Sequence, residues 1–125
     1  MFKTIMLIGA GSFLGGTSRY LISRAVEHGT TTTFPWGTMV VNIIGCLLVG
    51  LIYGLFERGS IGGQDLKMFL TVGFCGGFTT FSTFIHENYI FLNDRNFLYF
   101  LLYAVGSFAL GLTAAYLGHL IIKAF

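Results

Sequence analysis

Charged residues are scarce in this 125-residue chain: lysine, arginine, aspartate and glutamate make up 10% of it, whereas soluble domains average about 25%. Hydrophobic residues make up 54%, and the mean hydropathy is +0.79. A water-soluble fold of this size still shows much of its surface to solvent, and this composition lacks the polar residues to cover that surface. The shortage of charge therefore excludes an ordinary soluble domain and indicates a chain solvated by lipid.

Residues that carry enzyme chemistry are also scarce. The two cysteines, Cys46 and Cys75, lie within apolar stretches, which favours packing residues over a disulfide or a metal site. The three histidines lack the four-ligand spacing of a zinc site. The sequence has no phosphate-binding loop, nucleophile elbow or paired carboxylates, and its formal charge of +2 forms no nucleic-acid patch. We expect a protein that is not an enzyme.

Long apolar runs dominate what is present. Four segments of about 20 residues or more, 4–26, 36–56, 66–92 and 97–122, lie between clusters of glycine, proline, asparagine and charged residues. Twenty helical residues rise about 30 Å, the thickness of a hydrocarbon core. The sequence therefore predicts an all-α membrane protein with four transmembrane helices in a single domain spanning residues 1–125.

The first segment has an alternative interpretation as a signal peptide, because Lys3 precedes it and Gly15 and Gly16 resemble a cleavage site. Its apolar character continues to Val26, however, and three more spans follow it. We expect this segment to stay in the mature chain as the first helix.

Lysine and arginine are nearly balanced between the two ends of these spans. The end that holds the N-terminus collects Lys3, Arg58, Lys67 and Lys123, and the opposite end collects Arg24, Arg95 and, at its edge, Arg19. The excess of these residues in short loops sets the orientation of a membrane protein. A near balance is consistent with insertion both ways and antiparallel self-pairing, which would create the inverted symmetry of larger transporters. A single orientation with a cytoplasmic N-terminus is the alternative, and charge counting leaves both open.

The third span contains the run Gly73-Phe-Cys-Gly-Gly-Phe-Thr-Thr-Phe-Ser-Thr-Phe84, which places glycines and hydroxyls at membrane depth. Such groups are tolerated there where they face protein or line a polar cavity. A helix broken near its middle, at Gly76 and Gly77, would release carbonyls able to coordinate a hard cation such as sodium. The hydroxyls could instead bond back to the preceding turn. The run predicts a lined pathway or a bound-ion site.

Two phenylalanines of this run, Phe81 and Phe84, are three residues apart and share one helix face. An aromatic ring has a positive edge, which can accept an anion without offering a full charge. Lipid contact or core packing is the alternative for an apolar pair at helical spacing.

Three further polar residues lie within or near the ends of the spans. Asn42, in the second span, can donate its amide to an anion or act as glue between helices. Arg19, late in the first span, can raise the anion concentration at a pore mouth, tie helices together or extend to water. Glu87, near the end of the third span, can line a vestibule or be solvated at the interface.

Three segments together resemble one known family. They are Gly15-Gly-Thr-Ser-Arg-Tyr20, Gly37-Thr-Met-Val-Val-Asn-Ile-Ile-Gly45 and the glycine and hydroxyl run of the third span. This combination is similar to the small fluoride channels called Fluc or CrcB proteins. The likeness runs through most of the chain, and the fourth span matches mainly in hydropathy and in Ser107.

The resemblance implies a dual-topology homodimer of two antiparallel subunits in a bacterial inner membrane, with two pores that export fluoride passively and give fluoride resistance. It implies that the fluoride pathway includes Asn42, Phe81, Ser82, Thr83, Phe84, Tyr103 and Ser107. Arg19 matches the family's arginine, with a vestibular or structural role. Main-chain carbonyls of Gly76 and Thr79 from both subunits would hold one structural sodium ion at the dimer centre.

Two other function classes stay open. Small four-helix multidrug exporters, which exchange protons for aromatic cations, need a membrane-embedded carboxylate, and Glu87 is the only acid near membrane depth. A non-transporting subunit of a larger complex would explain the close-packing glycines but leaves the hydroxyl run without a purpose. The glycines four residues apart are Gly11 and Gly15, Gly50 and Gly54, and Gly73 and Gly77.

Overall fold

The computed structural model describes residues 1–29 and 33–125, and its regular secondary structure there is all helical. Three spans are single helices: α1 (Phe2–His28), α2 (Trp36–Arg58) and α6 (Phe97–Ala124). The third span consists of α3 (Gln64–Met68), the π-helical segment η1 (Phe69–Cys75), α4 (Gly76–Phe78) and α5 (Phe81–Asn93). Within the described residues, four helical stretches are long and apolar enough to cross a membrane, and each contains one predicted span.

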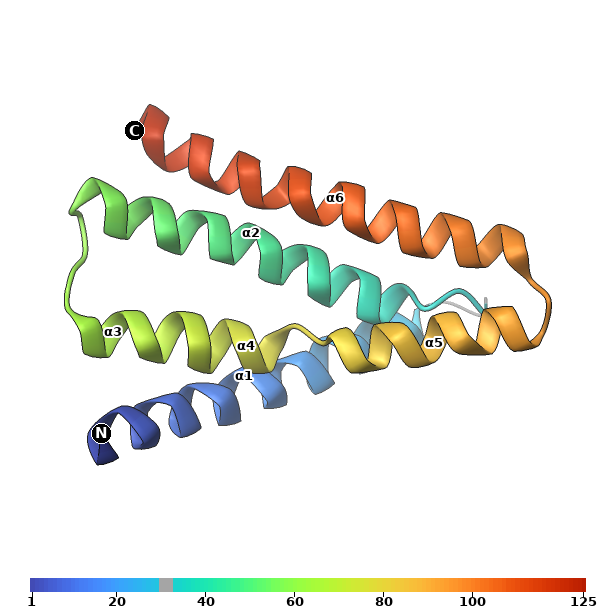
Figure 1. Cartoon of the computed structure of the whole chain (residues 1–125), viewed down its shortest axis with the longest axis horizontal. Coiled ribbons are helices and arrows are strands. Elements are labelled where there is room, and N and C mark those ends of the chain that lie inside the picture. The colour runs from blue at the N-terminus through green and yellow to red at the C-terminus, as the bar shows by residue number, and fades with distance from the viewer. Residues whose placement is uncertain (30–32) are drawn as a thin grey trace.

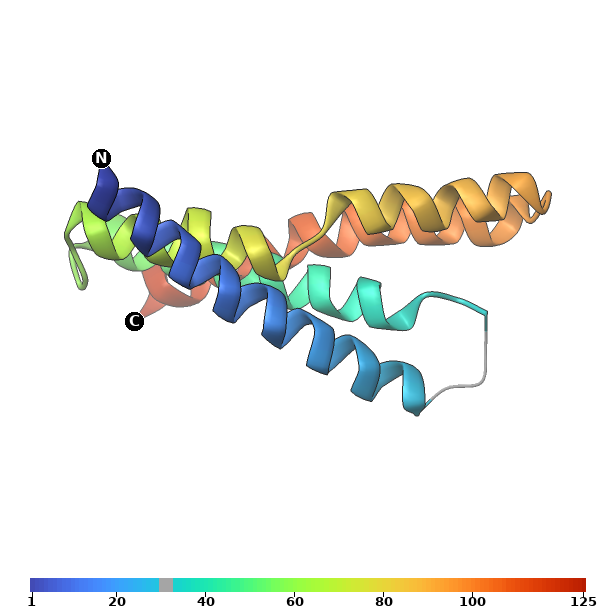
Figure 2. The same ribbon diagram turned by 90° about the horizontal axis from the view of Figure 1, so that it is seen from below.

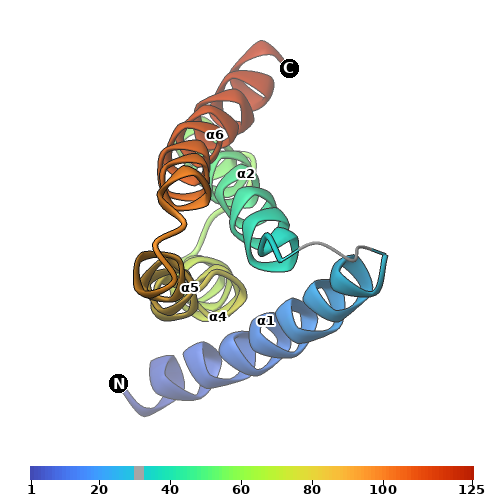
Figure 3. The same ribbon diagram turned by 90° about the vertical axis from the view of Figure 1, so that its right-hand side faces the viewer.

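The four spans run lengthwise, and both termini lie at the same end of the molecule (Figure 1). Helix α2 packs against α6 along one side and against α1 on the other, while α1 also packs against η1 and α4. Seen end-on, α2 lies between α6 and α1, with α4 and α5 beside them (Figure 3). At the end away from the termini, α5 stays beside α6, and α1 and α2 diverge from that pair (Figure 2).

The third span breaks near its middle, but not at the glycine pair where we expected the break. Gly76 and Gly77 are both helical, and the chain becomes extended at Thr79 (φ −86°, ψ 158°) and Thr80 (φ −146°, ψ 117°). A Cβ on Gly77 would lie 2.7 Å from the carbonyl oxygen of Ser12 in α1. This glycine therefore serves the close approach of two helices, and the extended residues follow it.

Glycine spacing predicts close helix packing, and the structure places these contacts inside one chain. A Cβ on Gly15 of α1 would overlap the carbonyl oxygen of Phe74 in the third span. A Cβ on Gly50 of α2 would overlap the carbonyl oxygen of Ala115 in α6. Small residues let the backbones approach closely where lipid supplies no hydrophobic drive between helices. The glycines therefore bring α1 to the third span and α2 to α6.

A buried apolar cluster lies near the N-terminal ends of α2 and α6. Tyr103 is fully buried and packs with Met39 and Phe91, which are nearly as well covered. Phe34, Ile43, Phe84, Tyr99 and Phe100 surround them. Elsewhere most large apolar side chains are exposed, as expected for helices whose outer faces contact lipid.

Candidate functional site

The Asn42 carboxamide in α2 binds the extended backbone at the break. Its Oδ1 accepts the backbone N–H of Thr80 at 2.8 Å, and its Nδ2 donates to the carbonyl oxygen of the same residue at 3.1 Å. Asn42 therefore joins two helices, as the interhelical interpretation of this residue expects. A carboxamide carries two N–H donors, and this contact uses one of them.

Hydroxyl groups of the predicted run bind the helix ends on either side of the break. The Thr79 hydroxyl donates to the carbonyl of Cys75 at 2.9 Å, which is the back-bonding pattern considered above. The Thr80 side chain caps α5 by accepting the backbone N–H of Thr83 at 3.3 Å, and it also donates to the Thr83 hydroxyl at 3.1 Å. These contacts end one helix and begin the next within two residues.

The break releases backbone carbonyls from α4. In an unbroken helix the carbonyls of Gly76 and Thr79 would accept the N–H groups of Thr80 and Thr83. Those two N–H groups are donated instead to side-chain oxygens, of Asn42 and of Thr80 respectively. The carbonyl of Gly77 accepts a hydrogen bond from the Arg19 Nε at 3.0 Å. The Arg19 side chain is half-buried, and this hydrogen bond ties α1 to the break.

A cavity of about 500 Å³ lies against this break, between α2, α5 and α6. Its lining residues are Asn42, Cys46, Val49, Thr79, Thr80, Phe81, Phe84, Ala104, Ser107, Phe108 and Ala115. Four of the residues predicted for an anion pathway, Asn42, Phe81, Phe84 and Ser107, therefore meet at one cavity. Ser82, Thr83 and Tyr103 are not part of its lining.

The two predicted ring-edge residues lie differently although they share a helix face. Their ring centroids are 6.1 Å apart. Phe84 is half-buried, and its centroid lies 4.9 Å from that of Tyr103. Phe81 is 74% exposed, so its ring projects from the chain beside the cavity. Phe84 packs against the buried cluster, and the Phe81 ring lies on the surface of the chain.

Ser107, in α6, lines this cavity, and its hydroxyl makes no hydrogen bond to the described residues. Its Oγ is buried and has no hydrogen-bond partner among the described residues. A serine in a membrane helix ordinarily bonds back to the carbonyl four residues earlier, as Thr113 of the same helix does with Ala109 at 2.7 Å. The Ser107 donor is therefore available to a group in the cavity.

Glu87 lies apart from this cavity in a second polar cluster. Its Oε1 accepts the Tyr103 hydroxyl at 2.8 Å, and its Oε2 accepts the Thr38 hydroxyl at 3.1 Å. Thr38 is buried, and our sequence analysis did not select it. A usable signal was present: Thr38 lies four residues before Asn42 and shares its helix face.

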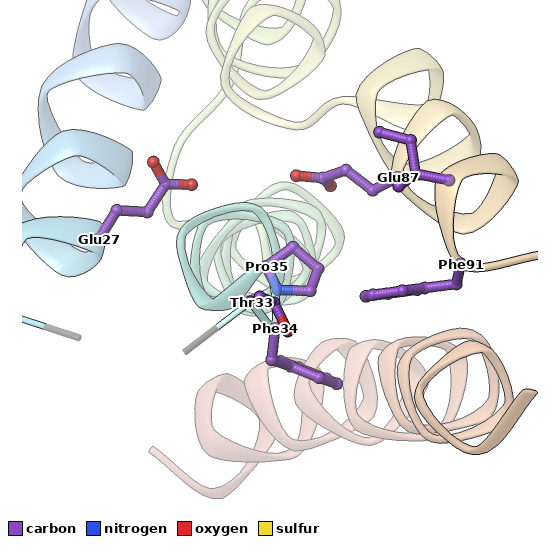
Figure 4. A pocket seen from close by; sticks show the side chains of 7 residues that line it. Glu27, Thr33, Phe34, Pro35, Glu87 and Phe91 are labelled. Carbon is purple, nitrogen blue, oxygen red and sulfur yellow. The ribbon is translucent and has the colours of Figure 1, made fainter. Parts of the chain in front are cut away.

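Glu87 also lines a cavity of about 350 Å³ together with Glu27, Thr33, Phe34, Pro35, Ile90 and Phe91. Glu27 comes from α1 and Glu87 from α5, and their carboxylates point toward each other from opposite sides of Pro35 (Figure 4). Glu87 therefore lines this cavity while it also accepts hydrogen bonds from Tyr103 and Thr38 inside the bundle. Glu27 was not selected from the sequence.

The two residues predicted to offer carbonyls to sodium also share a hollow. Gly76 and Thr79 line a cavity of about 270 Å³ together with Val49, Tyr53, Thr71, Val72 and Cys75. The described part of the chain holds no group of three or more histidine, cysteine, aspartate or glutamate side chains arranged for a metal ion. Carbonyl oxygens suit a hard monovalent or divalent cation better than a transition metal, so this donor set fits sodium.

Comparison with known proteins identifies the family of this chain. A family model described as "CrcB-like protein, Camphor Resistance (CrcB)" matches residues 6–119. A protein of Phocaeicola vulgatus named "Fluoride-specific ion channel FluC" is 43% identical over 116 residues, covering 93% of this chain and 95% of the relative. A protein of the same name from Flavobacterium psychrophilum is 44% identical over 121 residues, covering 97% of this chain and 98% of the relative.

Proposed function

Since the chain belongs to the CrcB-like family, a family of multi-pass membrane proteins, we propose that it is a fluoride-selective ion channel that lowers cytoplasmic fluoride. One observation carries this proposal: proteins named fluoride-specific ion channels are more than 40% identical to it over more than 90% of its length. The comparisons do not support the multidrug and proton antiporter considered from the sequence. A channel of this kind has no catalytic step.

The residues that line the cavity at the break include several weak donors for fluoride. Transferring a carboxylate-sized ion from water to a medium of low dielectric constant costs on the order of 20 kcal/mol, and fluoride is smaller. Asn42, Ser107, Phe81 and Phe84 line this cavity, where the second Asn42 N–H, the Ser107 hydroxyl and the two ring edges would serve as donors. None of these donors carries a full charge, so each replaces part of the hydration shell without trapping the anion.

The N-terminus of α5 adds positive potential at the same place. This helix begins at Phe81, and its N-cap Thr80 lines the cavity. The first N–H groups of a helix have no partner within the helix, and together with the helix dipole they favour an anion. Ser82 and Thr83 lie in this first turn, where their hydroxyls would continue the pathway beyond the cavity.

We propose that the working unit is an antiparallel homodimer of dual topology with two pores. The isolated chain exposes 7858 Å², against about 6,600 Å² for a compact protein of 13.7 kDa. The cavity opens at the protein surface, and the Phe81 ring beside it is 74% exposed. A second copy would supply the missing wall. The balanced lysine and arginine distribution suits insertion in both orientations.

A sodium ion at the dimer centre fits the carbonyl positions at the break. The carbonyls of Gly76 and Thr79 have lost their helical N–H partners to side chains, so they offer oxygen ligands. Two antiparallel copies would bring two such pairs together. Bound there, the ion would hold the broken helices of both subunits and add positive potential near the anion pathway.

Fluoride export through such a pore needs no coupled energy source. Hydrogen fluoride enters a cell uncharged and dissociates in a more alkaline cytoplasm. A membrane potential that is negative inside then drives the anion outward, with about 2.3 kcal/mol per charge for each 100 mV. We therefore propose a bacterial inner membrane as the location of the protein.

Fluoride efflux from liposomes that contain only the purified protein tests the proposal. A fluoride electrode follows release after valinomycin provides the potassium counter-current, and chloride-loaded liposomes are the control. We expect rapid fluoride release without chloride release. Folded dimers that release neither ion, or both equally, would contradict a fluoride-selective channel.

A further inference from the structure

The break in the third span leaves four backbone carbonyls, those of residues 76–79, without the N–H partners that a continuous helix would provide. Side chains from two other helices bind the backbone at and beside these groups. Asn42 of α2 accepts the backbone N–H of Thr80 at 2.8 Å and donates to the backbone carbonyl of Thr80 at 3.1 Å. Arg19 of α1 donates its Nε–H to the carbonyl of Gly77 at 3.0 Å. The break is therefore held from both sides.

We propose that Arg19 and Asn42 are positioning residues: together they hold the third span open at its break and leave the carbonyls of Gly76 and Thr79, among those of residues 76–79, to a cation. This proposal rests on the sodium site of the proposed function. Asn42 accepts the Thr80 N–H, which in a continuous helix would bond to the Gly76 carbonyl. Arg19 donates to the Gly77 carbonyl. This carbonyl therefore neither accepts an N–H from the start of α5 nor serves as a ligand of the cation.

The partner of Arg19 supports this assignment. The ion pairs among the described residues join Lys3 to Asp65 and His119 to Glu57, so the guanidinium of Arg19 binds a carbonyl rather than a carboxylate. It lies at the C-terminal end of the helical stretch 64–78, where the helix dipole favours a positive charge. A half-buried charge within a span is costly and tends to mark a functional position.

The positioning role and a simple charge effect predict opposite results for sodium. If Arg19 acted only through its charge, it would repel a nearby cation, and removing the charge would strengthen sodium binding. If Arg19 positions the break, removing the guanidinium lets the carbonyls relax and weakens sodium binding. The sign of the change therefore separates the two accounts.

The first experiment measures thermal unfolding of the purified full-length protein in detergent, with sodium chloride replaced stepwise by N-methylglucamine chloride at constant ionic strength. A ligand that binds only the folded state raises the unfolding temperature in a concentration-dependent way. For Arg19→Met we expect the sodium concentration that produces a given rise in unfolding temperature to increase by about tenfold, equivalent to about 1.4 kcal/mol. Arg19→Lys, which keeps a donor and the charge, should recover part of this loss.

Arg24→Met is the matched control, because Arg24 lies on the same helix, is exposed and donates to the Tyr20 hydroxyl at 3.1 Å. It should keep the wild-type sodium response. If Arg19→Met needs the same or a lower sodium concentration than the wild type for the same rise in unfolding temperature, the positioning role is overturned. A wild-type protein that conducts fluoride but shows no sodium response would overturn this proposal and the sodium site while leaving the channel function intact.

A second measurement remains decisive if Arg19→Met does not fold. Hydrogen exchange of the Thr80 amide, followed by NMR with 15N-threonine, reports the Asn42 contact without fluoride or sodium. We expect exchange in Asn42→Ala to be at least about tenfold faster at Thr80 and unchanged at Thr113, which lies in α6. Equal protection of Thr80 in both proteins would overturn the role of Asn42 at the break.

Discussion

The Tyr103 hydroxyl donates to the Glu87 carboxylate at 2.8 Å, although Tyr103 is fully buried and the two residues lie in different helices, α6 and α5. The Thr38 hydroxyl of α2 donates to the other oxygen of the same carboxylate. One acidic side chain therefore joins three helices. In this arrangement Glu87 is a hydrogen-bond acceptor between helices, which is the opposite of the free proton carrier that an antiporter needs.

Replacing Glu87 tests this structural role. Glu87→Ala should lower the free energy of unfolding by about 1–3 kcal/mol, because it leaves the buried hydroxyl of Tyr103 without its acceptor. Glu87→Gln keeps one acceptor oxygen, so it should cost less and retain fluoride efflux. Thermal unfolding and liposome efflux measure the two effects. Loss of transport in folded Glu87→Gln would contradict the structural role.

The ring-edge hypothesis predicts that Phe81→Ile and Phe84→Ile each reduce fluoride efflux. Isoleucine keeps apolar bulk but removes the positive ring edge. An edge-to-face pair of rings contributes about 0.5–1.5 kcal/mol, and with that as the scale for the lost contact we expect a loss of up to roughly tenfold. Phe13→Ile on α1, where the ring is 71% exposed, is the matched control and should conduct normally. Unchanged efflux in both test variants would sink the hypothesis.

The unpartnered hydroxyl of Ser107 should separate function from stability. Ser107→Ala removes a buried polar atom that has no partner among the described residues, so the free energy of unfolding should stay constant or rise. Fluoride efflux should fall, because the cavity loses a donor. Thr113→Ala in the same helix removes a hydroxyl that is already bonded to Ala109, and it should leave efflux unchanged. Normal efflux in Ser107→Ala would remove this residue from the pathway.

Close packing between α2 and α6 makes Gly50 sensitive to a single methyl group. Gly50→Ala should lower the free energy of unfolding by about 1–3 kcal/mol, because the new Cβ would overlap the carbonyl oxygen of Ala115. At Gly9 of α1 a Cβ would meet nothing within 4 Å, so Gly9→Ala should be neutral or slightly stabilising. Thermal unfolding in detergent compares the two. Equal stability of both variants would contradict the packing.

Composition and hydropathy by themselves determined that the chain is helical and crosses a membrane four times, because apolar runs of this length have no other stable form in lipid. The long motif of the third span was specific enough to indicate the fluoride channel family, and the comparisons bear this out. These properties are local in sequence, so they can be recognised without a structure.

Tertiary structure decided where the third helix breaks and what each polar side chain binds. The break lies at Thr79 and Thr80 rather than at the glycine pair because Asn42, 38 positions before Thr80, takes the N–H and carbonyl of Thr80. Arg19 reaches the Gly77 carbonyl over a separation of 58 residues. Hydrogen bonds between distant residues leave no periodicity in a sequence, so only the packing of the helices could assign them.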